Sequence, residues 1–217
     1  MNITLKLRSL GHIASLELYG TRQFCEQATS SFEGRIRKYK KELEDAPSRG
    51  SQPDDDYVVD LSGELNSRKQ SVCGFGLLMV YATLETYFLG IYEMTTIIAT
   101  DPQLREVVKV QSWLTLDAFK DFTKRLGVDV TIAPYNWHEL KKLQDLRNTI
   151  AHQMSQVTED NVHHLGECNY ELGQDLDLKL QDVMDSAKLV EETIQLYGTS
   201  YEAILKHKGL VEKNTLS

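Results

Sequence analysis

The 217-residue sequence lacks several features that would identify its chemistry directly. It has no Gly-rich phosphate loop, no Rossmann-type glycine pattern and no GxSxG nucleophile elbow, which excludes the common nucleotide-binding and serine-hydrolase motifs. Its three cysteines, Cys25, Cys73 and Cys168, are widely spaced and form no CxxC-type metal motif. We therefore expect reduced thiols without a chemical role, and neither a cofactor nor a metal ion.

An excess of positive charge is also missing. The chain has 24 Lys and Arg against 32 Asp and Glu, a formal net charge of −8, and a pI near 5.3. Holding nucleic acid by broad phosphate neutralisation requires many clustered cations, so this class is excluded, whereas brief substrate contact at a small basic site is not. The run "GRIRKYKK" at 34–41 is followed directly by acidic residues, and we interpret it as a solvated helix face rather than a binding patch.

The sequence has no apolar run long enough to suggest a membrane span. Its most apolar segment, 72–100, is interrupted by Glu85 and Glu93, and the longest charge-free stretch is shorter than the ~20 residues that a span requires. We expect a buried helix there and no membrane association. The start of the sequence does not resemble a secretion signal, so we expect a cytoplasmic protein.

Apolar spacing predicts a mainly α-helical fold. Alternating patterns allow short strands near the N-terminus, at "ITLKLR" and "IASLELY", and around 170–180. An acidic Pro- and Gly-containing linker at 45–56 ends an N-terminal helical extension, 1–56, and separates it from a helical domain over 57–217. The helices that we predict cover 21–45, about 61–98, 101–108, 116–127, about 136–156 and about 177–206.

The stretch "LQDLRNTIAHQM" at 143–154 has two distinct faces if it is helical. Apolar residues form one stripe: Leu140, Leu143, Leu146, Ile150, Met154 and Val157. Asn148 and His152 lie on the opposite face with Lys141, Asp145 and Ser155, and Arg147 borders the stripe. Geometry leaves two interpretations open: a solvated outer face, or a polar site open toward a substrate or a second subunit.

Within this stretch, "RNTIAH" resembles the signature of HEPN domains, in which Arg and a polar residue precede a His by a few positions. Its place on a late helix, after a long apolar helix and before one more helix, is also similar to that family over roughly 60–205. The resemblance implies a HEPN-like helical bundle. It also implies a homodimer in which two motifs meet in one cleft, and metal-independent endoribonuclease activity in a toxin–antitoxin, phage-defence or RNA-processing system.

The resemblance makes Arg147, Asn148 and His152 the candidate catalytic residues. The pKa of His suits proton transfer, Arg offers a fixed fork to phosphate oxygens, and Asn148 would orient the site by hydrogen bonding. The implied partners are RNA, a second copy of the chain, and an antitoxin or other defence-system protein. One branch of the family has a Tyr two residues after the His, where a nucleotidyltransferase antitoxin modifies it. Met154 stands there in this chain, so we do not expect that partner.

The alternative function is a non-catalytic HEPN module that binds a protein partner or a nucleotide. Among other residues, Ser155 is a candidate supporting residue, and so is Glu85, whose charge in an apolar helix is costly without a partner. Glu85 could hold the Arg147 guanidinium across the bundle or reach a polar edge, and the sequence leaves both open. We interpret His163, His164 and Cys168 as a surface loop rather than a metal site, and Tyr81, Tyr87 and Tyr92 as packing residues rather than platforms for bases.

Overall fold

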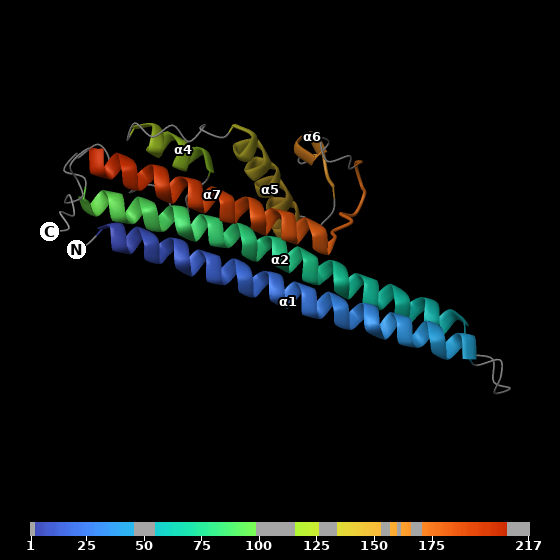
Figure 1. Cartoon of the computed structure of the whole chain (residues 1–217). Coiled ribbons are helices and arrows are strands. Elements are labelled where there is room, and N and C mark those ends of the chain that lie inside the picture. The colour runs from blue at the N-terminus through green and yellow to red at the C-terminus, as the bar shows by residue number, and fades with distance from the viewer. Residues whose placement is uncertain are drawn as a thin grey trace.

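A computed structural model shows a bundle of long helices in which the first runs antiparallel to the second and to the last, and these two run in the same direction (Figure 1). The structure describes residues 3–45, 55–98, 116–125, 134–152, 157–159, 162–165 and 171–207. Within these residues the prediction of a mainly α-helical fold is confirmed. The elements are α1 (Ile3–Asp45), α2 (Asp55–Ile98), α4 (Leu116–Arg125), α5 (Pro134–His152), α6 (Val162–Leu165) and α7 (Leu180–His207). The helix predicted over 101–108 lies outside the described residues.

The core lies where α1, α2 and α7 pack along one another. Each helix contributes apolar side chains at helical spacing, which forms a continuous stripe on its inner face. These side chains are Leu7, Ala14, Leu18 and Cys25 from α1, Leu77, Val80, Leu84 and Ile91 from α2, and Val183, Ala187, Val190 and Ile194 from α7. The N-terminal segment, which we expected to be an extension, therefore shares the core with the later helices.

Beyond the first turn of α7, the last turns of α1 and the first turns of α2 continue as a two-helix arm (Figure 1). Leu65 is buried in this arm, and the Lys69 Nζ lies 2.6 Å from the Glu33 Oε1 across its two helices. Within α2, Leu61–Thr95 is long and apolar enough to cross a membrane by length and composition alone, and 56% of its most apolar window is buried inside the bundle.

The prediction of strands near the N-terminus is wrong, because 3–45 is one helix. The alternation at "ITLKLR" would bury Leu5 and Leu7 on the same face of a strand. In the structure Leu7 is buried and Leu5 is exposed. The spacing that decides the conformation is longer: Leu7, Ala14 and Leu18 recur at helical intervals, and tertiary packing on this stripe overrides a six-residue alternation.

The alternating apolar and polar residues around 170–180, which allowed a short strand there, do not form a strand or a hairpin in the described residues 171–179. Residues 171–179 contain a turn and a single bridge residue, and no strand. Gly173 takes a positive φ of 82°, which places its amide to donate to the Val157 carbonyl at 2.8 Å. Leu176 and Leu178 point inward, and the Leu178 amide donates to the Gln70 Oε1 on α2 at 2.7 Å.

Helices α4 and α5 cover the bundle on the α2 and α7 side. Phe119 of α4 stacks on Phe88 of α2, with ring centroids 3.7 Å apart, and Phe122 lies against Tyr92 at 4.9 Å. Leu140 and Leu143 of α5 are buried, while Leu146 and Ile150 are partly buried against the core. This confirms the apolar stripe predicted for this helix and fixes its rotation; Met154 lies outside the described residues.

Candidate functional site

The rotation of α5 brings Arg147 to the border between α5 and α2. Its Nη2 lies 3.9 Å from the Glu85 Oε2, with 32% and 28% of the two side chains exposed. Its Nη1 donates a hydrogen bond to the Asn148 Oδ1 at 3.0 Å, and its guanidinium carbon lies 5.7 Å from the centre of the Tyr81 ring. The guanidinium is thus held by a carboxylate, an amide and an aromatic ring, and part of it still faces solvent.

Of the two hypotheses for Glu85, the structure places the carboxylate beside Arg147. Burial raises the pKa of Glu85, and the neighbouring Arg147 opposes that rise without cancelling it. Removing Arg147 would therefore raise the pKa of this partly buried carboxylate further and favour its neutral form. The charge on Glu85 therefore depends on Arg147.

Tyr81 completes this cluster from α2, one helical turn before Glu85. It is buried, which confirms the packing role predicted for Tyr81, Tyr87 and Tyr92. Burial raises the pKa of Tyr81, the negative charge of Glu85 raises it further, and Arg147 and Gln144 oppose these effects. The phenol therefore stays neutral and presents its ring to the guanidinium.

The outer face of α5 is open to solvent, as predicted for the face that carries Asn148. Asn148 and Ala151 are exposed, whereas Thr149 is buried and its hydroxyl donates to the Asp145 carbonyl at 2.9 Å. His152 is the last residue of α5, one turn after Asn148 on the same helix face. The His152 side chain and Ser155 lie outside the described part of the chain.

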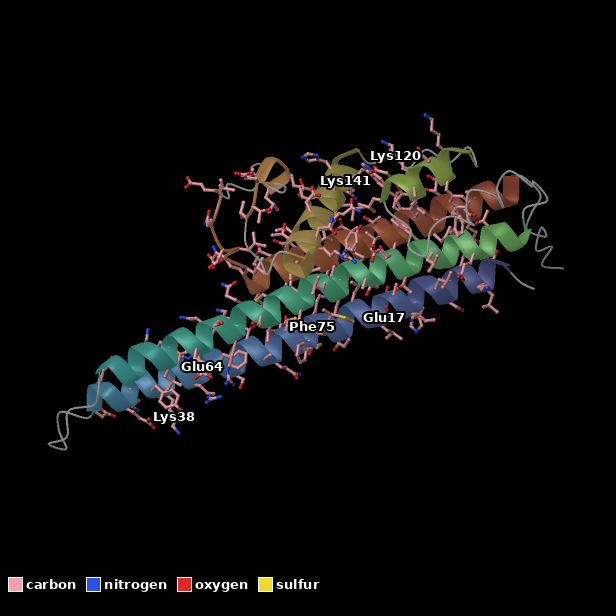
Figure 2. All side chains as sticks on the ribbon, turned by 180° about the vertical axis from the view of Figure 1, so that it is seen from behind. Glu17, Lys38, Glu64, Phe75, Lys120 and Lys141 are labelled. Atoms are coloured by element: carbon pink, nitrogen blue, oxygen red, sulfur yellow. The ribbon has the colours of Figure 1, made fainter. Side chains whose placement is uncertain are left out.

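A second polar contact fixes α5 against α4. Lys141, labelled in Figure 2, lies with its Nζ 2.6 Å from the Asp117 Oδ2 and donates to the Gln144 Oε1 at 3.1 Å. Gln144 thus lies between this contact and the Arg147 cluster. Sequence analysis missed Gln144 and the role of the Tyr81 ring. The helical spacing of Tyr81 and Glu85 could have placed these two together, but nothing local points to Gln144.

The remaining candidates carry no site in the described part of the chain. Cys25 and Cys73 are buried, free thiols, as predicted, and burial raises the pKa of Cys25 to about 11. His163 and His164 fall in the short α6 rather than in a loop, and their side chains are not described. Cys168 lies outside the described residues, and among those described no three His, Cys, Asp or Glu side chains gather as metal ligands would.

Comparison of the chain with protein-family models, with curated proteins and with solved structures finds no match. The candidate site therefore consists of the motif on α5 and the residues that α2 places around it.

Proposed function

We propose that this chain is a metal-independent endoribonuclease of the HEPN type, acting in a prokaryotic defence or toxin–antitoxin setting with an active site between two copies. The observation that carries the proposal is the placement of Arg147. The first residue of the motif is held by Glu85 and Asn148 and is still 32% exposed. Its guanidinium is therefore fixed in direction and still accessible from solvent, as binding of a phosphate requires.

Arg147 is suited to bind the scissile phosphate. A guanidinium has five N–H donors in a rigid plane. Asn148 takes one of them and Glu85 faces another edge. The donors that remain can bind two phosphate oxygens and stabilise the charge that builds on them during reaction.

His152 is the proposed proton-transfer residue. One base must remove the proton from a 2′-hydroxyl so that this oxygen attacks the adjacent phosphorus, and one acid must protonate the 5′-oxygen as its bond to phosphorus breaks. In a two-fold dimer only residues close to the axis lie near their own copies, so the proposal requires His152 to lie there, where two His152 side chains can supply the base and the acid. Asn148, one turn away on the same face, would orient the substrate or the His by hydrogen bonding.

Glu85 is the proposed positioning residue for Arg147. Glu85→Gln keeps the size of the side chain and removes its charge, so we expect weaker RNA cleavage with little change in the fold. Circular dichroism and urea unfolding would check the fold of the variant. Full activity in folded Glu85→Gln would remove this residue from the site.

The decisive experiment is cleavage of mixed RNAs in the presence of EDTA by the purified protein and by His152→Ala. His138→Ala is a matched control, because His138 is an exposed histidine on the same helix, outside the motif. We expect cleavage by the wild type and the control, and loss of cleavage in folded His152→Ala. If none of the three cleaves any of several RNAs, the nuclease proposal fails and a non-catalytic binding module is favoured, a function consistent with the acidic net charge of −8.

A further inference from the structure

The outer face of α2 carries a row of side chains spaced like the seam of a coiled coil. Successive members are separated alternately by four and three residues, which is the spacing that keeps one helix face against a partner helix. We call this set the outer α2 row: Arg68, Val72, Phe75, Met79, Ala82, Thr86, Leu89 and Glu93. All of them are exposed except Val72, which is half-buried.

The middle of the outer α2 row is unusually apolar for a solvent-facing surface. Phe75 is 51% exposed, Met79 39% and Leu89 36%. Phe75 and Met79 border a groove of about 410 Å³ between α2 and α1, which Gly20 and Phe24 line from the α1 side. Phe24 is also 51% exposed, and its ring meets that of Phe75 edge to face at 6.0 Å; Phe75 and Glu17 of this face are labelled in Figure 2. A contiguous exposed apolar surface of this kind marks an interaction site.

Charge at the two ends of the row indicates what binds there. Arg68 stands at one end and Glu93 at the other, and both are exposed. They are 25 residues apart, or about 37 Å at ~1.5 Å per residue, and their midpoint falls between Met79 and Ala82. A second α2 laid antiparallel over this midpoint would bring each Arg68 opposite a Glu93, twice in one symmetric contact. A parallel arrangement would instead place like charges together.

The same register pairs every other member of the row with a member of its copy. In each case a bulkier side chain meets a smaller one, so the two surfaces can interdigitate. The pairs are Val72 with Leu89, Phe75 with Thr86, and Met79 with Ala82. An arrangement chosen only to match the charges therefore also matches the sizes.

We propose that two copies of this chain associate through the outer α2 row, α2 against α2 in antiparallel orientation, with Arg68 of each copy opposite Glu93 of the other. The contact would be about 37 Å long and, with α1 at its edge, about 20 Å wide. This gives about 700 Å² per copy, close to the ~800 Å² of a standard interface. A lipid surface fits less well, since Glu17, Arg68 and Glu93 would all have to approach hydrocarbon.

This pairing also places the two candidate sites. The two-fold axis of such a contact lies in the interface and perpendicular to α2, so both α5 helices fall on the same edge of the dimer. Glu85 is four to five residues from the midpoint, and the two Arg147–Glu85 pairs would be offset by about 13 Å along α2. The dimer assumed in the proposed function thus gains a surface and a register. The pairing depends on the outer α2 row alone, and oligomeric state tests it independently of any cleavage.

Charge reversal at the two ends tests both the surface and the orientation. Arg68→Glu alone, or Glu93→Arg alone, makes both end contacts of a homodimer like-charged. We expect each to raise the dimer Kd at least about tenfold, measured by sedimentation and light scattering over a concentration series. When the two variants are mixed, the acidic side chain at position 68 of the first variant faces the basic side chain at position 93 of the second. At the other end of the contact, the unchanged Arg68 of the second variant faces the unchanged Glu93 of the first. The mixture should therefore form heterodimers, detected with a different tag on each variant.

Lys188→Glu is the matched control, because Lys188 and Arg68 each have an i,i+4 Glu partner on their own helix, and Lys188 lies on α7 away from the row. It should leave the dimer intact. A wild type that stays monomeric at about 100 μM overturns the proposal, as does a dimer that either charge reversal leaves unchanged. A mixture that stays monomeric refutes the antiparallel register. Binding of a monomeric wild type to phosphatidylcholine–phosphatidylglycerol vesicles, abolished by Phe75→Glu, would assign the face to lipid and also overturn it.

Discussion

Gly76 of α2 is the point at which the core should tolerate a side chain least. A Cβ placed on Gly76 would lie 2.6 Å from the Cys25 Sγ on α1 and 2.9 Å from the Val183 Cγ1 on α7. Ordinary contacts between such atoms are about 3.5–4.0 Å, so a single methyl group would overlap with both neighbouring helices. Cys25 and Val183 are fully buried, which leaves little room for either to move. The absence of a side chain at position 76 sets how closely the three helices approach.

Gly76→Ala should therefore be destabilising although Ala is the better helix former. Overpacking of a core typically costs about 1–3 kcal/mol, whereas Gly to Ala in an exposed helix gains about 1 kcal/mol. Gly34 and Gly63 provide matched controls, because a Cβ on either meets nothing within 4 Å. We expect the free energy of unfolding of Gly76→Ala to be about 1–3 kcal/mol lower than that of Gly34→Ala or Gly63→Ala.

Urea unfolding followed by circular dichroism at one protein concentration measures these differences. Adding Cys25→Ala to Gly76→Ala removes the atom nearest to the new methyl group, and should recover part of the loss in a double-mutant cycle. Equal stability of Gly76→Ala and the two control variants would refute the close approach of α1, α2 and α7 at this position. So would the absence of any coupling to Cys25.

Three further predictions test other parts of the structure. Phe119→Ala removes a fully buried ring stacked on Phe88 and should cost about 3–5 kcal/mol in urea unfolding; a loss below about 1 kcal/mol would contradict the packing of α4. Because burial raises the pKa of Cys25 to about 11, its thiol should resist dithionitrobenzoate near pH 8 in a Cys168→Ser background and react once urea unfolds the chain. Burial raises the pKa of Glu85 above 4.5, so the folded protein retains a proton there that the unfolded chain releases. The stability of the wild type relative to Glu85→Gln should then fall as pH rises through this range, and a gap independent of pH would argue against the burial of the carboxylate.

Local spacing was sufficient to predict the helix that carries the motif. Leu140 and Leu143 are buried and Asn148 is exposed, as the apolar stripe required. Arg147 lies at the border of that stripe, where its position along the helix places it. These features depend only on a 3.6-residue period, and a single sequence contains that information.

Contacts between distant segments were beyond this kind of prediction. Glu85 and Arg147 are 62 residues apart, and only the packing of α5 on α2 decides that they meet. The outer α2 row shows the same limit. The apolar segment 72–100 predicts a buried helix, yet Phe75, Met79 and Leu89 are exposed because no described helix covers that face. Periodicity identifies an apolar face but does not say which neighbour covers it.

The geometry of α2 allows subunit association and catalysis to be tested separately. Glu85 lies beside the outer α2 row but is not a member of it, so Glu85→Gln should weaken cleavage in a protein that still dimerises. Arg68→Glu should weaken dimerisation at least about tenfold while the contacts of Arg147 within its own chain stay intact. If the active site spans two subunits, Arg68→Glu and Glu93→Arg should each be inactive alone and regain cleavage when mixed, in parallel with the heterodimer measured by light scattering. Undiminished cleavage by monomeric Arg68→Glu would instead place the whole site within one chain, and the proposed use of two His152 side chains would then be wrong.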